Sequence, residues 1–486
     1  MTMRLLPFAL LSIIVCALVN PGNFGTIDTT RRLQVARWIR LGEPPVRSAD
    51  VEFGLLGKQG TREAWFGIGQ SLVLVPFDAG VSATVFPVLN RLGFDSAKRE
   101  QIVDLLIAFL MQSLITTGLL ALAYEVLVLL GFQHRIGVAG ALALLFGTTA
   151  LPYVQCAQEN NLLLVLALVS LYAILKCHLG AGFWWAALAG TACGFAILTR
   201  LPSLLETAVL FVLAISIGCN RKQFVAGYLP PIAAALLVDR WYQWYRFGDL
   251  FDTYMDVFGV QVRPPFSHPF WKGFLGIVFS ADKSILLFDP LLVVLILVAV
   301  WRWRSIQRPV RLLVGWLAVL LLLYACTYAK YFDFGGDVAW GHRFMTLPVE
   351  LLAMLAVPLL LTHARKLRRL LWVVACAAVI LQVSSTMLAP NLEVIQREMG
   401  YDNGVIVNRA INLVQIAFDQ KDARRFAGVS IEWQHLYYFP FQLQFRFPKL
   451  AVWAIAAWLA LLACLPLLVW TALRNGSKRK PLKHKG

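Results

Sequence analysis

Charged residues are scarce in this sequence of 486 residues. They make up 15% of the chain, whereas hydrophobic residues make up 59%, and the mean hydropathy is +0.68. Soluble globular proteins contain about 25% charged and about 45–50% apolar residues. Because a soluble fold cannot remove so much apolar surface from water, the composition excludes a soluble globular domain, a disordered chain and a collagen-like chain. It predicts an integral membrane protein.

Paired cysteines are also lacking. The eight cysteines form no Cys-x-x-Cys motif and show no metal-site spacing, so neither a disulfide framework nor a metal cluster is expected. The histidines expected on the outer side, His268, His342 and His435, do not form an H-x-x-x-H motif. We therefore expect no metal ligands and no required cofactor, with a divalent metal ion kept only as a minor alternative.

Long apolar segments are abundant. A helix that crosses the ~30 Å hydrocarbon core needs about 20 apolar residues. Such segments predict an all-α polytopic membrane protein of about twelve transmembrane helices, near 5–20, 104–131, 136–154, 160–176, 183–200, 203–219, 223–239, 285–301, 312–329, 344–363, 370–389 and 450–473. Only Arg4 precedes the first segment and no A-x-A cleavage pattern follows it, which favours a helix over the alternative of a signal peptide.

Basic residues are distributed unevenly between these segments. With a cytoplasmic N-terminus, the short inner connections and the C-terminal tail contain basic residues and no acidic one. This positive-inside pattern predicts that both termini are cytoplasmic and that the long loops 21–103, 240–284 and 390–449 lie outside. The net charge of +17 is then explained by topology and by contacts of the tail with membrane lipids, rather than by nucleic-acid binding.

The first outer loop, 21–103, combines arginines with apolar residues. Apolar residues and four arginines alternate over 29–41, which predicts a helix in the plane of the lipid headgroups. A second interfacial or re-entrant segment, too short to span, is predicted to begin near Gly67 and Gly69 and to end at Pro76.

Asp28 directly follows the first apolar segment, and Arg31 lies one helical turn further on. A carboxylate at the membrane surface can accept a proton from an incoming hydroxyl or amine, and an arginine can bind a lipid phosphate. The alternative is that Asp28 only caps the 29–41 helix.

Several stretches in this order resemble bacterial membrane glycosyltransferases of the GT-C superfamily. After the Asp-x-x-Arg of residues 28–31, these stretches are "FGIGQSLVLVPF", "TTALPYVQCAQENN", "GFAILTRLPSLLE" and "FGGDVAWGHRF". The similarity is to the protein O-mannosyltransferase and aminoarabinose-transferase type, and it covers roughly residues 20–360. Each stretch is loose by itself, and their order is the more specific signal.

The resemblance implies an inverting transfer of a sugar from a polyprenyl-phosphate carrier to a lipid, glycan or protein acceptor on the outer face of the bacterial inner membrane. It implies that Asp28 is the general base, that Glu159 is a second acidic position, and that Arg31, Arg200 and Arg343 lie near the carrier phosphate. Relatives often carry a Lys where this chain has Ala64-Trp65-Phe66. The remaining candidates for substrate or phosphate binding are Arg62, which takes the place of that Lys, and Lys330 and His342, which precede Arg343.

Three alternatives stay open from the residues alone. Arg200 can pair with Glu206 in a structural ion pair, and the aromatic residues near Arg343 can form an ordinary interfacial belt. The whole protein can also be a lipid-linked sugar flippase or transporter, or a structural subunit, without covalent chemistry. We divide the chain into a GT-C-like membrane module (1–389), an outer-face loop region (390–449), and a last transmembrane helix with a basic cytoplasmic tail (450–486).

Overall fold

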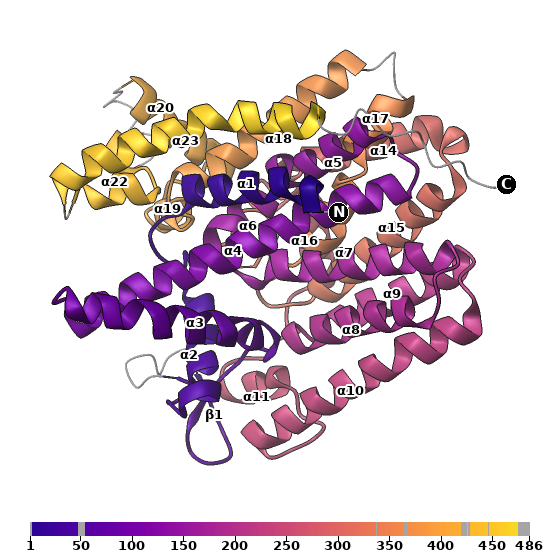
Figure 1. Cartoon of the computed structure of the whole chain (residues 1–486), viewed down its shortest axis with the longest axis horizontal. Coiled ribbons are helices and arrows are strands. Elements are labelled where there is room, and N and C mark those ends of the chain that lie inside the picture. The colour runs from indigo at the N-terminus through magenta and orange to yellow at the C-terminus, as the bar shows by residue number, and fades with distance from the viewer. Residues whose placement is uncertain are drawn as a thin grey trace.

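The computed structural model describes residues 2–46, 54–336, 338–363, 368–418, 425, 428–445 and 447–474. The basic tail beyond Arg474, which is predicted to contact lipid headgroups, lies outside the described residues. The described chain is almost entirely α-helical, and most of the long helices run in a similar direction (Figure 1).

In its described residues, the first half of the chain contains a hairpin of two short strands and ten helices. These elements are α1 (Thr2–Val19), α2 (Ile27–Leu41), β1 (Gly54–Leu56), β2 (Arg62–Ala64), α3 (Gly69–Arg91), α4 (Ser96–Leu129), α5 (His134–Gly147), α6 (Ala150–Cys156), α7 (Glu159–His178), α8 (Phe183–Thr199), α9 (Ser203–Ser216) and α10 (Arg221–Phe247).

The regular elements in the described residues of the second half are all helices, connected by turns and loops. Its elements are α11 (Tyr254–Gln261), α12 (Phe270–Phe279), α13 (Ile285–Phe288), α14 (Pro290–Arg302), η2 (Trp303–Ser305), α15 (Arg308–Tyr328), α16 (Thr346–Ala353), α17 (Ala356–His363), α18 (Arg368–Met387), α19 (Leu392–Glu398), α20 (Val405–Phe418), η4 (Trp433–His435), α22 (Phe439–Leu443) and α23 (Pro448–Arg474). Figure 1 shows α2, β1, α19 and α22 toward one end of the bundle and α9, α14 and α15 toward the other.

Six segments of the described chain are long and apolar enough to cross a membrane. They are α3, α4, α7, α15, the segment of α16 and α17, and α23, and the number rises to eight if α5–α6 and α18–α19, which are bent by 58° and 77°, each count as one. The chain is thus a helical protein of the multi-pass membrane type. All twelve predicted segments overlap helices. However, α8, α9 and α14 have only 17, 14 and 13 residues and are too short to count as membrane spans, so the predicted number of about twelve spans is not confirmed.

The prediction that Pro76 ends an interfacial segment is wrong. Helix α3 continues through Pro76 and Pro87 to Arg91 and has the length of a membrane span. A proline removes one backbone donor, and packing of the helix against its neighbours offsets that loss in an apolar setting. Here the apolar residues of α3 and α4 form a common cluster.

Helix α3 is also fixed to α2 by buried charges. Asp78 is fully buried, and its carboxylate pairs with Arg37 at 3.2 Å and with Arg40 at 2.6 Å. Arg37 extends the network to Asp104 of α4 at 2.6 Å. These ion pairs orient the amphipathic helix α2 against α3 and α4, and they account for two of its four arginines.

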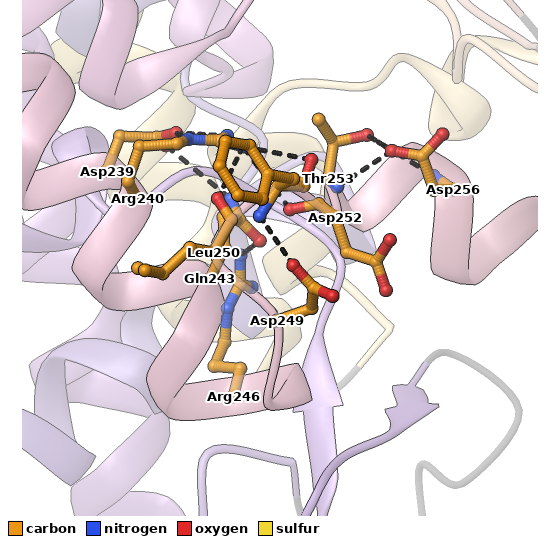
Figure 2. A network of polar contacts seen from close by, with 10 residues as sticks. Asp239, Arg240, Gln243, Arg246, Asp249, Leu250, Asp252, Thr253 and Asp256 are labelled. Atoms are coloured by element: carbon orange, nitrogen blue, oxygen red, sulfur yellow. Dashed lines mark hydrogen bonds and ion pairs between the residues drawn. The ribbon is translucent and has the colours of Figure 1, made fainter.

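The loop after α10 is organised by its own polar residues (Figure 2). Arg240 pairs with Asp239 at 2.6 Å and donates to the carbonyl oxygens of Leu250 and Phe251. Thr253 and Asp256 form a capping box at the start of α11. The carboxylates of Asp239 and Asp256 therefore stabilise the turn between α10 and α11.

The outer-face loop region is held by a buried ion pair. Arg409 of α20 binds Glu393 of α19 at 2.5 Å, and both side chains are 1% exposed. Its guanidinium also donates to the carbonyl oxygens of Ser384 and Ser385 at the end of α18. Arg409 thus joins residues of 390–418 to the membrane helix that precedes them.

Replacement of Arg409 by methionine should lower the free energy of unfolding by about 3–5 kcal/mol, because Glu393 is left as an uncompensated buried charge. Arg397→Met is the matched control, since Arg397 pairs with Asp282 and Asp402 while its side chain is 37% exposed. We expect that control to cost less than about 1 kcal/mol. Thermal unfolding of the purified variants measures both, and equal losses would contradict the structural role of Arg409.

Candidate functional site

Asp28 lies in the first turn of α2. The N-cap is Thr26, whose hydroxyl accepts a hydrogen bond from the backbone N–H of Asp28. The alternative that Asp28 serves only as the N-cap of this helix is therefore wrong. Because the cap is provided by Thr26, the Asp28 carboxylate is available for contacts outside its own helix.

Arg343 joins the two acidic candidates. Its Nη2 lies 2.6 Å from Asp28 Oδ2 and 3.4 Å from Glu159 Oε1, although the three residues are far apart in the sequence. The carboxylates differ in access, since the Asp28 side chain is 17% exposed and that of Glu159 is 3% exposed. Burial lowers the pKa of Arg343, but Asp28 and Glu159 outweigh it, so the pKa lies above its ordinary value and the guanidinium stays charged.

Arg32 completes this group of charges, which we call the ion-pair cluster (Asp28, Arg32, Glu159 and Arg343). Arg32 Nη2 lies 2.9 Å from Glu159 Oε2, and its guanidinium stacks over the Phe66 ring at 4.2 Å. Sequence reasoning missed Arg32 and selected its neighbour Arg31. The available signal was spacing, because a residue four positions after Asp28 shares its helix face.

Arg31 is buried, and its Nη1 donates to Gln34 Oε1 at 3.2 Å. The ion-pair partner of Asp28 is therefore Arg343 from a distant segment rather than Arg31 on the same helix.

The position of Glu159 is set by a break between α6 and α7. Ala157 adopts the left-handed conformation with φ of 52°. Its carbonyl oxygen accepts hydrogen bonds from Thr29 at 3.0 Å and from Gln70 at 2.9 Å, which connects the break to α2 and α3. Glu159 then occupies the first turn of α7, where a carboxylate is favoured by the helix dipole.

Helix α7 also holds the backbone of Arg343. Asn160 donates to the Arg343 carbonyl oxygen at 2.9 Å and to the Thr346 hydroxyl at 2.7 Å. The turn before it requires Gly341, whose φ is 67° and whose missing side chain lets Phe288 and Thr149 approach. The loop 338–345 is thus built so that the Arg343 side chain meets Glu159.

Arg200 caps the end of α8 beside the cluster. Its guanidinium lies 4.7 Å from the Phe344 ring centre and 5.4 Å from that of Tyr328, and it interacts electrostatically with Glu159 and Arg343. The alternative pairing with Glu206 is not formed, since the buried Glu206 carboxylate has no hydrogen-bond partner among the described residues.

A close helix contact sets the place of Arg200. A Cβ added at Gly69 would overlap the hydroxyl of Thr199 and lie 2.6 Å from its backbone nitrogen, so α3 begins directly against the end of α8. Glycine at this position is therefore required by space and not by its backbone angle.

Gly69→Ala should reduce the free energy of unfolding by about 1–3 kcal/mol, because the added methyl group forces α3 and α8 apart. Gly80→Ala in the same helix is the control, since an added Cβ there meets no atom within 4 Å. That variant should be neutral or slightly stabilising because alanine is the better helix former. Thermal unfolding of the two variants decides, and similar melting temperatures would refute the close contact.

His342 is buried near the cluster, and neither ring nitrogen has a hydrogen-bond partner among the described residues. Burial, followed by the charge of Lys283, lowers its pKa to about 3, so the imidazole is neutral at pH 7. The structure does not bring the other two candidates to the cluster. Lys330 is exposed after the end of α15, and Arg62 is exposed in β2, where it donates to the Gly54 carbonyl oxygen.

The site carries an excess of positive charge and several unsatisfied donors. Arg32, Arg200 and Arg343 face the two carboxylates of Asp28 and Glu159. Buried guanidinium nitrogens of Arg32 and Arg343 lack hydrogen-bond partners in the described protein. Since buried polar groups are normally hydrogen-bonded, these atoms suit a polar, anionic ligand.

In the described part of the chain, the cluster is not a metal site. Within the described ranges, no three His, Cys, Asp or Glu side chains are grouped so that they could hold a metal ion. Two cavities, one near Trp303 and Trp316 and one near Phe86 and Arg99, have other lining residues.

Comparisons of the chain with protein-family models, with curated proteins and with solved structures found no match. The resemblance to GT-C glycosyltransferases thus stays a prediction.

Proposed function

We propose that this protein is an integral membrane glycosyltransferase that moves a sugar from a polyprenyl-phosphate carrier to an acceptor. The observation that carries the proposal is the contact of the Arg343 guanidinium with both Asp28 and Glu159. Asp28, Glu159 and Arg343 were selected from the sequence as parts of a single site, and Arg343 lies within hydrogen-bond distance of both carboxylates.

The unequal access of the two carboxylates supports different roles. Asp28 is the more exposed, and only its Oδ2 is engaged by Arg343, so it can accept the proton of the acceptor hydroxyl or amine. Glu159 is buried between Arg32 and Arg343, and it orients these two cations.

The excess of arginines supports phosphate as the leaving group. The acceptor atom forms a bond to the anomeric carbon as Asp28 removes its proton, and the carbon–oxygen bond to the carrier phosphate breaks. The electron pair leaves with the phosphate oxygen, where Arg343, Arg200 and Arg32 stabilise the developing charge. A single displacement of this kind inverts the anomeric centre and releases polyprenyl phosphate.

The proposal includes the topology that the charges favour. About twelve helices then span the bacterial inner membrane, while α3 stays in the outer loop 21–103. Both termini are cytoplasmic, and the ion-pair cluster faces outside. The basic connections between the predicted spans support this orientation.

The proposal is tested with the purified protein in proteoliposomes and a set of polyprenyl-phosphate sugars that are labelled in both the sugar and the lipid. We expect release of labelled polyprenyl phosphate together with transfer of the labelled sugar to extracted membrane acceptors. Movement of the intact lipid-linked sugar between leaflets without cleavage would instead establish the flippase alternative. Neither cleavage nor movement with any sugar would favour a structural subunit.

A further inference from the structure

A second feature of the chain is a groove at the beginning of α15. It has a volume of about 560 Å³ and is lined by Trp303, Arg308, Arg311, Gly315, Trp316 and Val319. An added Cβ at Gly315 would meet no atom within 4 Å, so the groove stays open beside the helix. We call it the arginine groove.

The arginine groove and the ion-pair cluster lie at opposite ends of one membrane helix. Helix α15 has 21 residues and begins at Arg308, and its last residue, Tyr328, lies beside Arg200. At 1.5 Å per residue the two ends are roughly 30 Å apart, which equals the thickness of the hydrocarbon core. The groove therefore lies at the membrane boundary opposite to the cluster, whichever way the protein is oriented.

The charges around the groove have one sign. Arg302, Arg304, Arg308 and Arg311 fall within ten residues, and the sequence contains no acidic residue between Pro290 and Phe332. The wall of the groove is apolar below the arginines, at Gly315 and Val319. Cations at the mouth and apolar surface below match a molecule with an anionic headgroup and a hydrocarbon chain.

The two tryptophans complete this arrangement. Tryptophan is favoured at membrane interfaces because it combines an apolar ring with a polar N–H group. The Trp316 indole donates to Ser216 of α9 at 3.2 Å, which fixes that ring as one wall of the groove. Trp303 in η2 forms the other end of the lining.

We infer that the arginine groove binds an anionic glycerophospholipid. Its phosphate lies between Arg308 and Arg311, and one acyl chain packs along Gly315 and Val319. A zwitterionic lipid is disfavoured because its cationic headgroup meets Arg308 and Arg311, the two arginines that line the groove. The inference does not depend on the proposed enzymatic activity.

The test measures lipid binding to the full-length protein in detergent with phosphatidylglycerol, phosphatidylcholine and polyprenyl phosphate as probes. Native mass spectrometry reports the bound lipid. The double variant Arg308→Gln/Arg311→Gln should bind phosphatidylglycerol roughly tenfold or more weakly, since each interfacial arginine contributes about 1 kcal/mol. The control Arg302→Gln/Arg304→Gln removes the same charge from residues that do not line the groove and should bind within about twofold of the wild type.

A third variant tests whether the lipid binds inside the groove, because it fills the groove without changing its charge. Gly315→Leu places a side chain in the groove, where its Cβ would meet no atom within 4 Å, and leucine is a better helix former than glycine, so the fold should be preserved. It should abolish the high-affinity binding of phosphatidylglycerol. Equal weakening in the two double variants, unchanged binding by Gly315→Leu, or equal or tighter binding of phosphatidylcholine or polyprenyl phosphate would each overturn the inference.

Discussion

Replacement of Asp28 by asparagine is expected to lower the rate of sugar transfer by about 10²–10⁴-fold, which is the usual contribution of a general base. The amide has nearly the same shape as the carboxylate and can still accept a hydrogen bond from Arg343, but it cannot take the proton of the acceptor. Binding of the lipid-linked donor should change little, because the arginines remain in place. The measurement is single-turnover release of polyprenyl phosphate at saturating donor.

The chain offers a closely matched control for this variant. Asp104 also forms an ion pair with an arginine, Arg37, at 2.6 Å, and its side chain is 26% exposed compared with 17% for Asp28. Asp104→Asn removes the same charge from the network of α2, α3 and α4 and should leave the transfer rate within about twofold. If the two variants lost activity equally, the effect of Asp28 would be one of structure or net charge, and its role as base would be excluded.

Replacement of Glu159 by glutamine should destabilise the protein by about 3–5 kcal/mol and should also abolish transfer. The side chains of Glu159 and Arg32 are 3% and 2% exposed, so the variant leaves Arg32 as a buried cation without its partner. Arg343 and Arg200 add further positive charge at the same place. Chemical unfolding in detergent measures the loss of stability.

The double variant Arg32→Gln/Glu159→Gln separates the two effects of Glu159. Removing both charges should recover part of the lost stability, because no uncompensated cation is left. Transfer should stay low, since the phosphate has lost one of its arginines and Arg343 one of its carboxylates. Glu398→Gln, at the exposed end of α19, is the control for the loss of a carboxylate and should change neither quantity. Equal stability of the single and double variants would show that Glu159 and Arg32 are not coupled.

The helices of this protein were largely predictable from the sequence. The apolar segments near 104–131 and 160–176 correspond to α4 and α7, and the Arg-rich stretch 29–41 corresponds to α2. The errors arose where local rules compete with packing. Pro76 is a strong local signal for the end of a segment, yet α3 continues through it because apolar residues on both sides of Pro76 pack against α4.

The site was predictable only in its parts. Asp28 was selected from its place after the first apolar segment, and Glu159, Arg200 and Arg343 from the resemblance to a family of enzymes. The local pattern did not indicate which cation contacts which carboxylate. Arg31 was the nearest cation to Asp28 in the sequence, but the partner of Asp28 is Arg343, which lies 315 residues away. Arg62 and Lys330 were selected by position in a motif and remain exposed at other places.

Composition and hydropathy by themselves determined that this chain is a helical membrane protein, since apolar segments of this length are stable only where water is excluded. The spacing of single residues also determined that Asp28 begins an amphipathic helix at the end of the first apolar segment. Only the tertiary structure decided that Arg343 contacts both Asp28 and Glu159 and that Arg32 forms a second ion pair with Glu159. The reason is that the burial of a charge depends on every segment packed around it, and a buried charge is stable only where the fold supplies the opposite one.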